Sequence, residues 1–129
     1  MIQKKFTNER RRHPRLYSNI PVKLCCDEFD IVTETKNLSR SGAYCRVNKY
    51  IEPMTRLKIY LLLPFKREEK VITKKVSFSG VIVRTESVPG EEGFNIAVYF
   101  NDIQDKDALR IEEFVNTSMV DDGNFVSNS

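Results

Sequence analysis

The sequence predicts a mainly β fold, a six-stranded antiparallel β-barrel with a C-terminal α-helix packed on it. Short segments in which apolar and polar residues alternate recur between residues 20 and 101, which is typical of strands with one buried face. Turn-forming residues separate these segments. One amphipathic segment follows the last of them, and packing on the barrel would bury its apolar stripe. The 129 residues suffice for one domain with its own core.

The alternating segments define six strands. The first expected strand is Ile20–Cys26. The others are expected at Ile31–Ser39, Ala43–Val47, Arg56–Leu63, Lys74–Glu86 and Phe94–Phe100. Because proline lacks an amide donor, Pro64 is expected to end the fourth strand, and Phe65–Lys70 to form a charged hairpin loop. Gly80, in the middle of the long fifth strand, indicates a bend or bulge at a barrel corner.

A single helix is predicted after the strands, beginning at Asp105 or Asp102 as the capping residue and running to about Val115. Its apolar stripe consists of Ala108, Ile111 and Val115. The strand Phe94–Phe100 is apolar on both faces. We therefore expect this helix to pack against the outside of that strand.

The charge of the chain is mild and unevenly placed. The formal net charge is +3, yet residues 1–16 hold six Lys or Arg against one Glu. We expect residues 1–19 to form a flexible basic arm, 20–101 the barrel, 102–118 the helix and 119–129 a loose polar tail. Positive charge confined to an arm fits a small anionic ligand better than a long polyanion wrapped around the fold.

The arm contains the run Arg10-Arg11-Arg12-His13-Pro14-Arg15. Arginine presents a planar fork of donors that suits phosphate oxygens or the O6/N7 edge of guanine. His13 precedes a proline, which favours extended backbone, and residues four apart then point to the same side. Arg11 and Arg15 could thus hold separate parts of one ligand. Taken alone, such a run is more often a solvated basic tail.

A second motif, Asn37-Leu38-Ser39-Arg40-Ser41-Gly42, lies at the end of the second expected strand. In a strand, Asn37 and Ser39 share one face and Leu38 points to the other. The amide and hydroxyl groups suit hydrogen bonding along a guanine edge. Gly42 permits either a positive φ or close approach of a ligand to the backbone. Without the arginines, an ordinary hairpin turn would explain these residues equally well.

The two motifs together resemble the PilZ family of bacterial cyclic-di-GMP receptors. The first is R-x-x-x-R, extended by Arg10, and the second is [D/N]-x-S-x-x-G. The chain is identified as a single-domain member of that family over roughly residues 9–115. The resemblance implies that the arginines clasp guanine and phosphate groups, and that the Asn and Ser contact the same ligand from the barrel surface. It assigns ligand binding to Arg10, Arg11, Arg15, Asn37, Ser39 and Gly42. A ligand form of two stacked molecules is compatible with the arginine motif.

Other chemistry finds little support in the sequence. The only histidine, His13, lies in the arm, so no catalytic triad or dyad is predicted and the chain is not expected to be an enzyme. No metal site is expected, because one histidine and no C-x-x-C are present. Three cysteines without a paired framework fit free thiols in the cytoplasm. No apolar run approaches the roughly 20 residues of a membrane span.

The expected function is a cytoplasmic cyclic-di-GMP effector in which ligand orders the arginine arm onto the barrel and changes a surface for an unidentified downstream protein. Motility, adhesion or biofilm regulation are compatible with it. One alternative is a PilZ-like protein-interaction scaffold that binds no nucleotide. Another is a small β-barrel that binds single-stranded nucleic acid by stacking bases on aromatic side chains. The latter is disfavoured because the aromatic residues follow core patterns, namely Phe78, Phe94, Tyr99 and Phe100.

The sequence leaves several points open. It does not identify the partner, the ligand stoichiometry or the oligomeric state. Nor does it decide whether Arg12, Arg40 or Arg46 contacts the ligand.

Overall fold

A computed structural model describes residues 14–17 and 19–121. Residues 1–13, 18 and 122–129 lie outside the described part, and with them most of the expected flexible arm and of the expected polar tail. Those two expectations remain predictions. Within the described residues, the chain contains six strands and one helix in the order expected.

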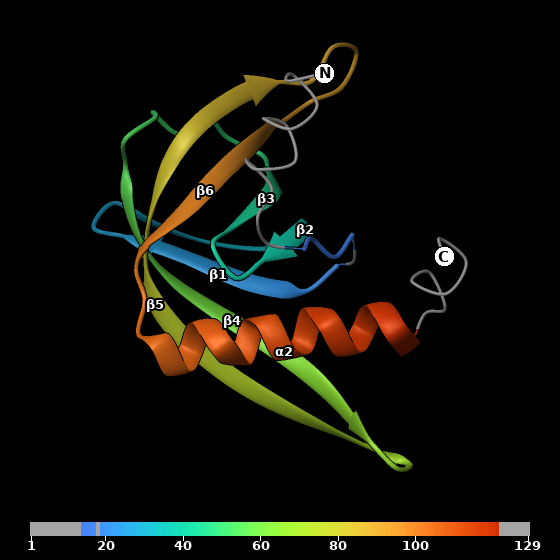
Figure 1. Ribbon diagram of the computed structural model, residues 1–129. Helices are drawn as coiled ribbons and strands as arrows, with labels where there is room; N and C mark the ends of the chain where they lie inside the picture. The colour runs from blue at the N-terminus through green and yellow to red at the C-terminus, as the bar shows by residue number, and fades with distance from the viewer. Residues whose placement is uncertain (1–13, 18, 122–129) are drawn as a thin grey trace, which may run out of the picture.

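The strands are antiparallel and form a closed ring. The elements are β1 (Pro21–Cys26), β2 (Phe29–Ser39), β3 (Gly42–Val47), β4 (Arg56–Arg67), β5 (Lys70–Ser87), β6 (Phe94–Asp102) and α2 (Asp105–Asp121). The hydrogen-bonded order is β1-β2-β3-β6-β5-β4, and β1 pairs with β4 to close the barrel. The predicted mainly β fold with six antiparallel strands and one C-terminal helix is confirmed (Figure 1).

The hairpin between β4 and β5 differs from the prediction. Pro64 does not end β4; it pairs with Thr73, and the strands continue to Arg67 and Lys70. The turn is therefore Glu68-Glu69, and the expected loop Phe65–Lys70 is mostly strand. Proline is tolerated because β1 pairs with β4 only at Lys58–Leu61, so the other edge of β4 needs no amide donor at this point. The two strands project as a ribbon beyond the rest of the sheet (Figure 1).

Strand β5 belongs to both halves of the ring. Its residues up to Val81 pair with β4, and its residues from Ser79 onward pair with β6. The register shifts between Ser79 and Val81, which places the predicted irregularity at Gly80. A Cβ at Gly80 would lie 2.5 Å from Ile59 Cδ1 and 3.0 Å from Tyr99 O. Glycine is thus needed here because the neighbouring strands approach closely.

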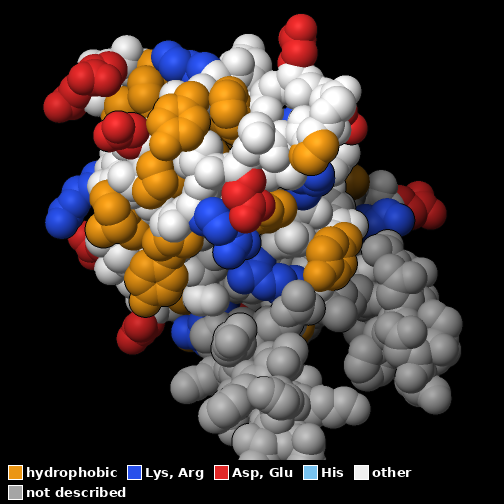
Figure 2. Space-filling view, turned by 90° about the horizontal axis from the view of Figure 1, so that it is seen from above, with side chains coloured by type: hydrophobic (Ala, Val, Ile, Leu, Met, Phe, Trp, Pro, Cys, Tyr) orange, Lys and Arg blue, Asp and Glu red, His pale blue; other side chains and the backbone are white. Residues whose placement is uncertain are grey.

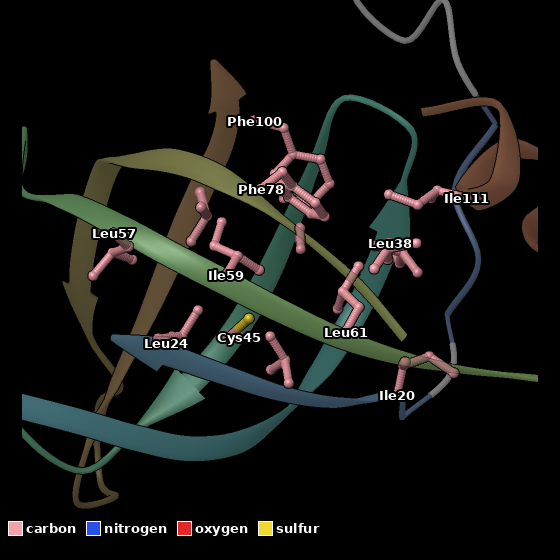
Figure 3. Close-up of a cluster of buried hydrophobic side chains, with 14 of the residues drawn as sticks. Ile20, Leu24, Leu38, Cys45, Leu57, Ile59, Leu61, Phe78, Phe100 and Ile111 are labelled. Atoms are coloured by element: carbon pink, nitrogen blue, oxygen red, sulfur yellow. The ribbon is translucent and has the colours of Figure 1, made fainter. Parts of the chain in front are cut away.

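The core fills the ring with side chains from every strand. Figure 3 shows Leu24 of β1, Leu38 of β2, Cys45 of β3, Ile59 of β4 and Phe78 of β5 pointing into one cluster. All five are at most 4% exposed. Inward and outward residues alternate along β1 and β4, as the sequence patterns predicted.

Helix α2 begins at Asp105, while Asp102 ends β6. Its predicted apolar stripe is confirmed, since Ala108, Ile111 and Val115 are 5%, 0% and 1% exposed. The expected position of the helix on the outside of β6 is wrong. It packs instead against β2 and β4, near the start of the ribbon that β4 and β5 form (Figure 1).

An aromatic pair fixes this packing. The Phe114 ring of α2 meets the Phe65 ring of β4 edge to face, with centroids 5.6 Å apart. On the outside of β6, Tyr99 is 52% exposed. Apolar residues on both faces of a strand do not reveal which element covers the outer face, or whether that face stays partly exposed. The position of the helix therefore could not be predicted from this strand alone.

Candidate functional site

The residues after the arginine run are joined to β2. Leu16 and Leu38 exchange two backbone hydrogen bonds of 2.8 and 3.0 Å. Four residues later, the Thr35 amide donates to the Ile20 carbonyl at 2.9 Å, and the Ile20 amide donates to Thr35 Oγ1 at 3.1 Å. Leu16 and Ile20 are 4% and 2% exposed, so burial of two apolar side chains holds this segment on the barrel.

This anchoring brings the two sequence motifs together. Arg15 Nη1 donates to Asn37 Oδ1 at 2.6 Å. Both side chains are half-buried, at the point where the chain enters the pairing between Leu16 and Leu38. Two residues 22 apart in sequence therefore share one site. Of the predicted ligand-binding arginines, Arg10 and Arg11 lie outside the described residues.

A bulge in β2 aims Asn37 outward. Thr35 pairs with Cys45 and Asn37 pairs with Tyr44, which leaves Lys36 as an extra residue. The bulge shifts the alternation, so that Thr35 and Leu38 are both buried while Asn37 stands on the outer face. The amide of Asn37 thereby becomes available beside Arg15.

Ser39 holds the turn that follows. Its side chain is 1% exposed. Ser39 Oγ accepts a hydrogen bond from the Ser41 amide at 3.2 Å and donates to the Gly42 carbonyl at 3.4 Å. The hydroxyl therefore fixes the backbone of the β2–β3 turn. This arrangement gives Ser39 a role in shaping the turn, whatever the turn binds.

Gly42 is required by its neighbours in the sheet. Gly42 does not have a positive φ, whereas Gly90 and Gly93 do. A Cβ at Gly42 would lie 2.7 Å from the Val98 carbonyl oxygen of β6. The structure does not give the positive φ that the sequence suggested for this glycine. It gives the close approach of another strand.

The sheet register extends the outer face of the site across β3, β6 and β5. Asn37 pairs with Tyr44, Tyr44 with Ala97, and Ala97 with Arg84. The small side chain of Ala97 separates Tyr44 from Arg84, whose guanidinium carbon is 6.0 Å from the Tyr44 ring centroid. Glu86 accepts from Tyr44 Oη at 3.1 Å and pairs with Arg84 Nε at 3.2 Å.

Sequence reasoning missed Tyr44 and Arg84 because they belong to strands whose pairing partners cannot be read from alternation alone. Only the bulge at Lys36 and the order of strands in the ring place them in the row of Asn37.

Two other arginines near the second motif have acidic partners. Arg40 Nη1 lies 2.9 Å from Glu112 Oε1 of α2, which connects the β2–β3 turn to the helix. Arg46 Nη2 lies 2.7 Å from Glu91 Oε1 and donates to the Glu92 carbonyl at 2.7 Å. Figure 2 likewise shows basic and acidic side chains next to one another on the face seen from above. Arg12 lies outside the described residues.

Other parts of the described structure offer less to a ligand. A hollow of about 1080 Å³ lies near the β1–β2 turn and the start of β4, and no predicted site residue lines it. Among residues 14–17 and 19–121, no group of three or more His, Cys, Asp or Glu side chains could hold a metal ion. Within the same residues, no helix is long and apolar enough to cross a membrane.

Comparison with known proteins decides the family. The sequence of the PilZ domain matches residues 9–117, which include both motifs and all six strands. The chain belongs to the PilZ domain family. No curated protein sequence matches it significantly.

Solved structures of other proteins share the fold. The structure of the Bacillus subtilis inhibitor of motility MotI/DgrA superposes with a TM-score of 0.74 at 19% identity, covering 87% of this chain and 52% of its own. YcgR from Escherichia coli in complex with c-di-GMP gives 0.67 at 10% identity, covering 92% and 50%. The isolated PilZ domain of YcgR with c-di-GMP gives 0.61 at 11% identity, covering 93% and 99%. This chain thus spans about half the length of MotI/DgrA and of YcgR.

Proposed function

We propose that this PilZ chain is a cyclic-di-GMP-binding effector of bacterial second-messenger signalling, acting in the cytoplasm as a receptor and not as an enzyme. The observation that carries the proposal is the 2.6 Å hydrogen bond between Arg15 and Asn37, which joins the two sequence motifs in one site. The family membership and the fold shared with YcgR, whose structures contain c-di-GMP, support it.

The ligand matches the side chains of the site. Cyclic-di-GMP carries two phosphates and two guanines, which offer anionic oxygens and O6/N7 edges to arginine forks. We assign these contacts to Arg10, Arg11 and Arg15, with Asn37 as donor and acceptor at a guanine edge. Ser39 and Gly42 then serve by shaping the turn beside the ligand, because the Ser39 hydroxyl and the Gly42 carbonyl are bonded to each other.

The mechanism we propose is an ordering of the arginine arm. The chain from Leu16 to Ile20 is already fixed to β2, so ligand need only draw Arg10 and Arg11 onto the barrel beside Arg15. The free energy lost by ordering a few residues, roughly 1–2 kcal/mol each, can be offset by several arginine contacts of about 1–3 kcal/mol. The arm in its new position then changes a surface for a protein partner in motility or biofilm regulation.

Calorimetric titration with cyclic-di-GMP tests the proposal. We expect saturable binding with a Kd in the micromolar range or below, and a stoichiometry that distinguishes one bound molecule from two. The variant Arg11→Ala/Arg15→Ala should bind at least about 100-fold more weakly, since two arginine contacts are lost. Arg56→Ala, which removes an exposed arginine at the start of β4, is the matched control and should bind as the wild type does. GTP should not compete.

Absence of heat and of thermal stabilisation with folded wild-type protein, up to millimolar ligand, would refute the proposal. The chain would then be a PilZ-like scaffold in which Arg15 and Asn37 bond only to each other and to their neighbours in the fold.

A further inference from the structure

The outer face of β1, β2 and β4 carries a groove away from both sequence motifs. Lys23 of β1 pairs with Val32 of β2 on one side and with Tyr60 of β4 on the other, so these three side chains form one row across the sheet. Pro21 and Cys25 flank Lys23 along β1 and are short. The neighbouring strands carry larger side chains, and a groove of about 670 Å³ results.

The walls of this groove are apolar. Val32 is 77% exposed, Leu62 is 40% exposed and Tyr60 is half-buried. These apolar side chains lie on a face of the barrel that points to solvent. The two walls stand two strands apart, about 10 Å, which admits one row of side chains from another molecule. The solvated face of an antiparallel sheet is normally polar, so exposed apolar walls along a groove indicate a surface that becomes covered.

One end of the groove leads to a cationic ribbon. Lys75, which lines the groove, pairs with Leu62 and stands 5.7 Å from the Tyr60 ring centroid. From there to the tip, the ribbon carries five cationic and two anionic residues, namely Lys66, Arg67, Lys70, Lys74 and Lys75 against Glu68 and Glu69. Of the cations, Lys66 and Lys75 lie on the face of the groove, because Lys74 pairs with the inward Leu63 and stands over the Phe65 ring on the other face. Nearer β1, Asp30 lies 3.9 Å from Lys23 and partly offsets its charge.

The ribbon also has an edge that the fold does not use. Lys70 to Phe78 of β5 pair only with β4, since pairing with β6 begins at Ser79. Lysine side chains on an open edge discourage pairing with an identical edge. A second copy approaching through the same face would bring two cationic ribbons together. Charge complementarity therefore favours a different molecule with negative charge.

We propose that this groove and the adjoining ribbon bind an acidic amphipathic segment of a partner protein. Apolar side chains of that segment would pack beside Lys23 on Val32, Tyr60 and Leu62, and its carboxylates would meet Lys75 and Lys66 on the same face of the ribbon. The proposal deepens the proposed function by naming the partner surface, because Pro21 in the groove directly follows the arm segment that carries Arg15. Binding of the acidic segment to this surface does not require bound nucleotide.

Two synthetic helical peptides of equal length test this surface. Both carry Leu at helical spacing i, i+3, i+4 and i+7, one with Glu and the other with Lys at the remaining positions. Amide resonances of the isotope-labelled full chain are followed during titration. We expect the Glu peptide to shift the amides of Lys23, Val32, Leu62 and Lys75, and the Lys peptide to bind at least about tenfold more weakly.

Two surface variants and two matched controls sharpen the experiment. Leu62→Asp and Lys66→Glu/Lys75→Glu should each weaken binding of the Glu peptide at least about tenfold. Leu109→Asp and Lys106→Glu change exposed residues of α2 and should stay within about twofold of the wild type. Leu62→Asp should retain the wild-type affinity for cyclic-di-GMP, so failure of this surface and failure of the nucleotide site are distinguishable.

Several outcomes would overturn the inference. These are no shift at the groove up to millimolar Glu peptide, equal binding of the Lys peptide, or shifts confined to another face. Sedimentation that shows a dimer abolished by Leu62→Asp would assign the groove to a second copy instead. Co-sedimentation with anionic phospholipid vesicles, in the absence of peptide binding, would assign it to a membrane surface.

Discussion

The Cys45 thiol is surrounded by the barrel interior and is 1% exposed. Burial raises its pKa from 9.0 to about 12, because the thiolate loses its hydration there. The folded protein therefore keeps the proton up to about pH 12, whereas the unfolded chain releases it above about pH 9. Stability from this thiol is complete below the lower value and is lost as the pH rises between the two.

We predict a pH effect that depends on Cys45. Between about pH 8 and pH 10, the free energy of unfolding of the wild type should fall by about 1.4 kcal/mol more than that of Cys45→Val. Denaturant titrations of both proteins measure the difference, and other titrating groups cancel in the comparison. Parallel pH profiles would contradict the prediction. Cys25 and Cys26 are half-buried, so at pH 8 they should react with a thiol reagent faster than Cys45.

Single residues also show how far the sequence could be read. The chemistry of Arg15 and Asn37 was apparent from their side chains, and the structure adds the contact that joins them. Gly42 was singled out as a ligand-binding residue, and the structure adds a β6 carbonyl 2.7 Å from where its Cβ would stand. No local pattern reveals that approach, since it depends on which strand lies alongside β3.

Among the elements, the short segment from Leu16 to Ile20 connects the arginine arm with the barrel. Leu16 is 4% exposed, belongs to the core cluster and pairs with Leu38 through its backbone. The buried Leu16 side chain therefore holds the backbone next to Arg15 on the barrel. Leu16 and Ile20 both form backbone hydrogen bonds with β2, ahead of the start of β1 at Pro21.

We predict that Leu16→Ala destabilises the fold by about 2–4 kcal/mol, because it removes buried apolar volume. It should also weaken cyclic-di-GMP binding, since Arg15 is then held less firmly. Tyr17→Ala is the control, because Tyr17 is 68% exposed in the same segment. Chemical denaturation and calorimetry give the two quantities. If Leu16→Ala kept wild-type stability, the arm would not be anchored by its core contact.

Element boundaries could be predicted where one physical rule dominates. The alternation in Arg56–Leu63 and the stripe Ala108, Ile111 and Val115 reflect burial, and both are confirmed. The break at Pro64 was wrong because the rule about the missing amide donor applies only where a partner strand needs that donor. Whether a strand edge is free is a property of the assembled sheet.

For the molecule as a whole, the distribution of charge argues for a small ligand. Beyond the basic arm, Arg40 and Arg46 are paired with acids, and basic and acidic side chains lie next to one another on the face shown in Figure 2. Phe78 and Phe100 are each 4% exposed and cannot stack on bases. Of the aromatic residues considered for nucleic-acid binding, Tyr99 alone is exposed by more than half.

We therefore predict a shallow salt dependence. Raising the salt from about 50 to 200 mM should weaken cyclic-di-GMP binding by less than about tenfold, because the ligand has only two phosphates. A single-stranded oligonucleotide should bind weakly at the higher salt. A loss of several hundredfold for the oligonucleotide, starting from tight binding at low salt, would instead support the nucleic-acid alternative. Fluorescence anisotropy at both salt concentrations makes the comparison.

The ring order was accessible from sequence only through family resemblance. Alternation identifies strands but not neighbours, and neither the pairing of β3 with β6 nor that of β1 with β4 follows from proximity in the chain. The position of α2 on β2 and β4 depends on that same order.

Closure of the ring has a consequence for how the chain reaches its native state. The β4–β5 pair joins twelve residues of each strand across a two-residue turn, so it can assemble early from neighbouring chain. Pairing of β1 with β4 and of β3 with β6 must bring distant segments together, and such non-local contacts slow folding. We expect the β4–β5 ribbon to be structured in the folding transition state and the β1–β4 seam to close last, which φ-values for Thr73→Ala and Val22→Ala can check.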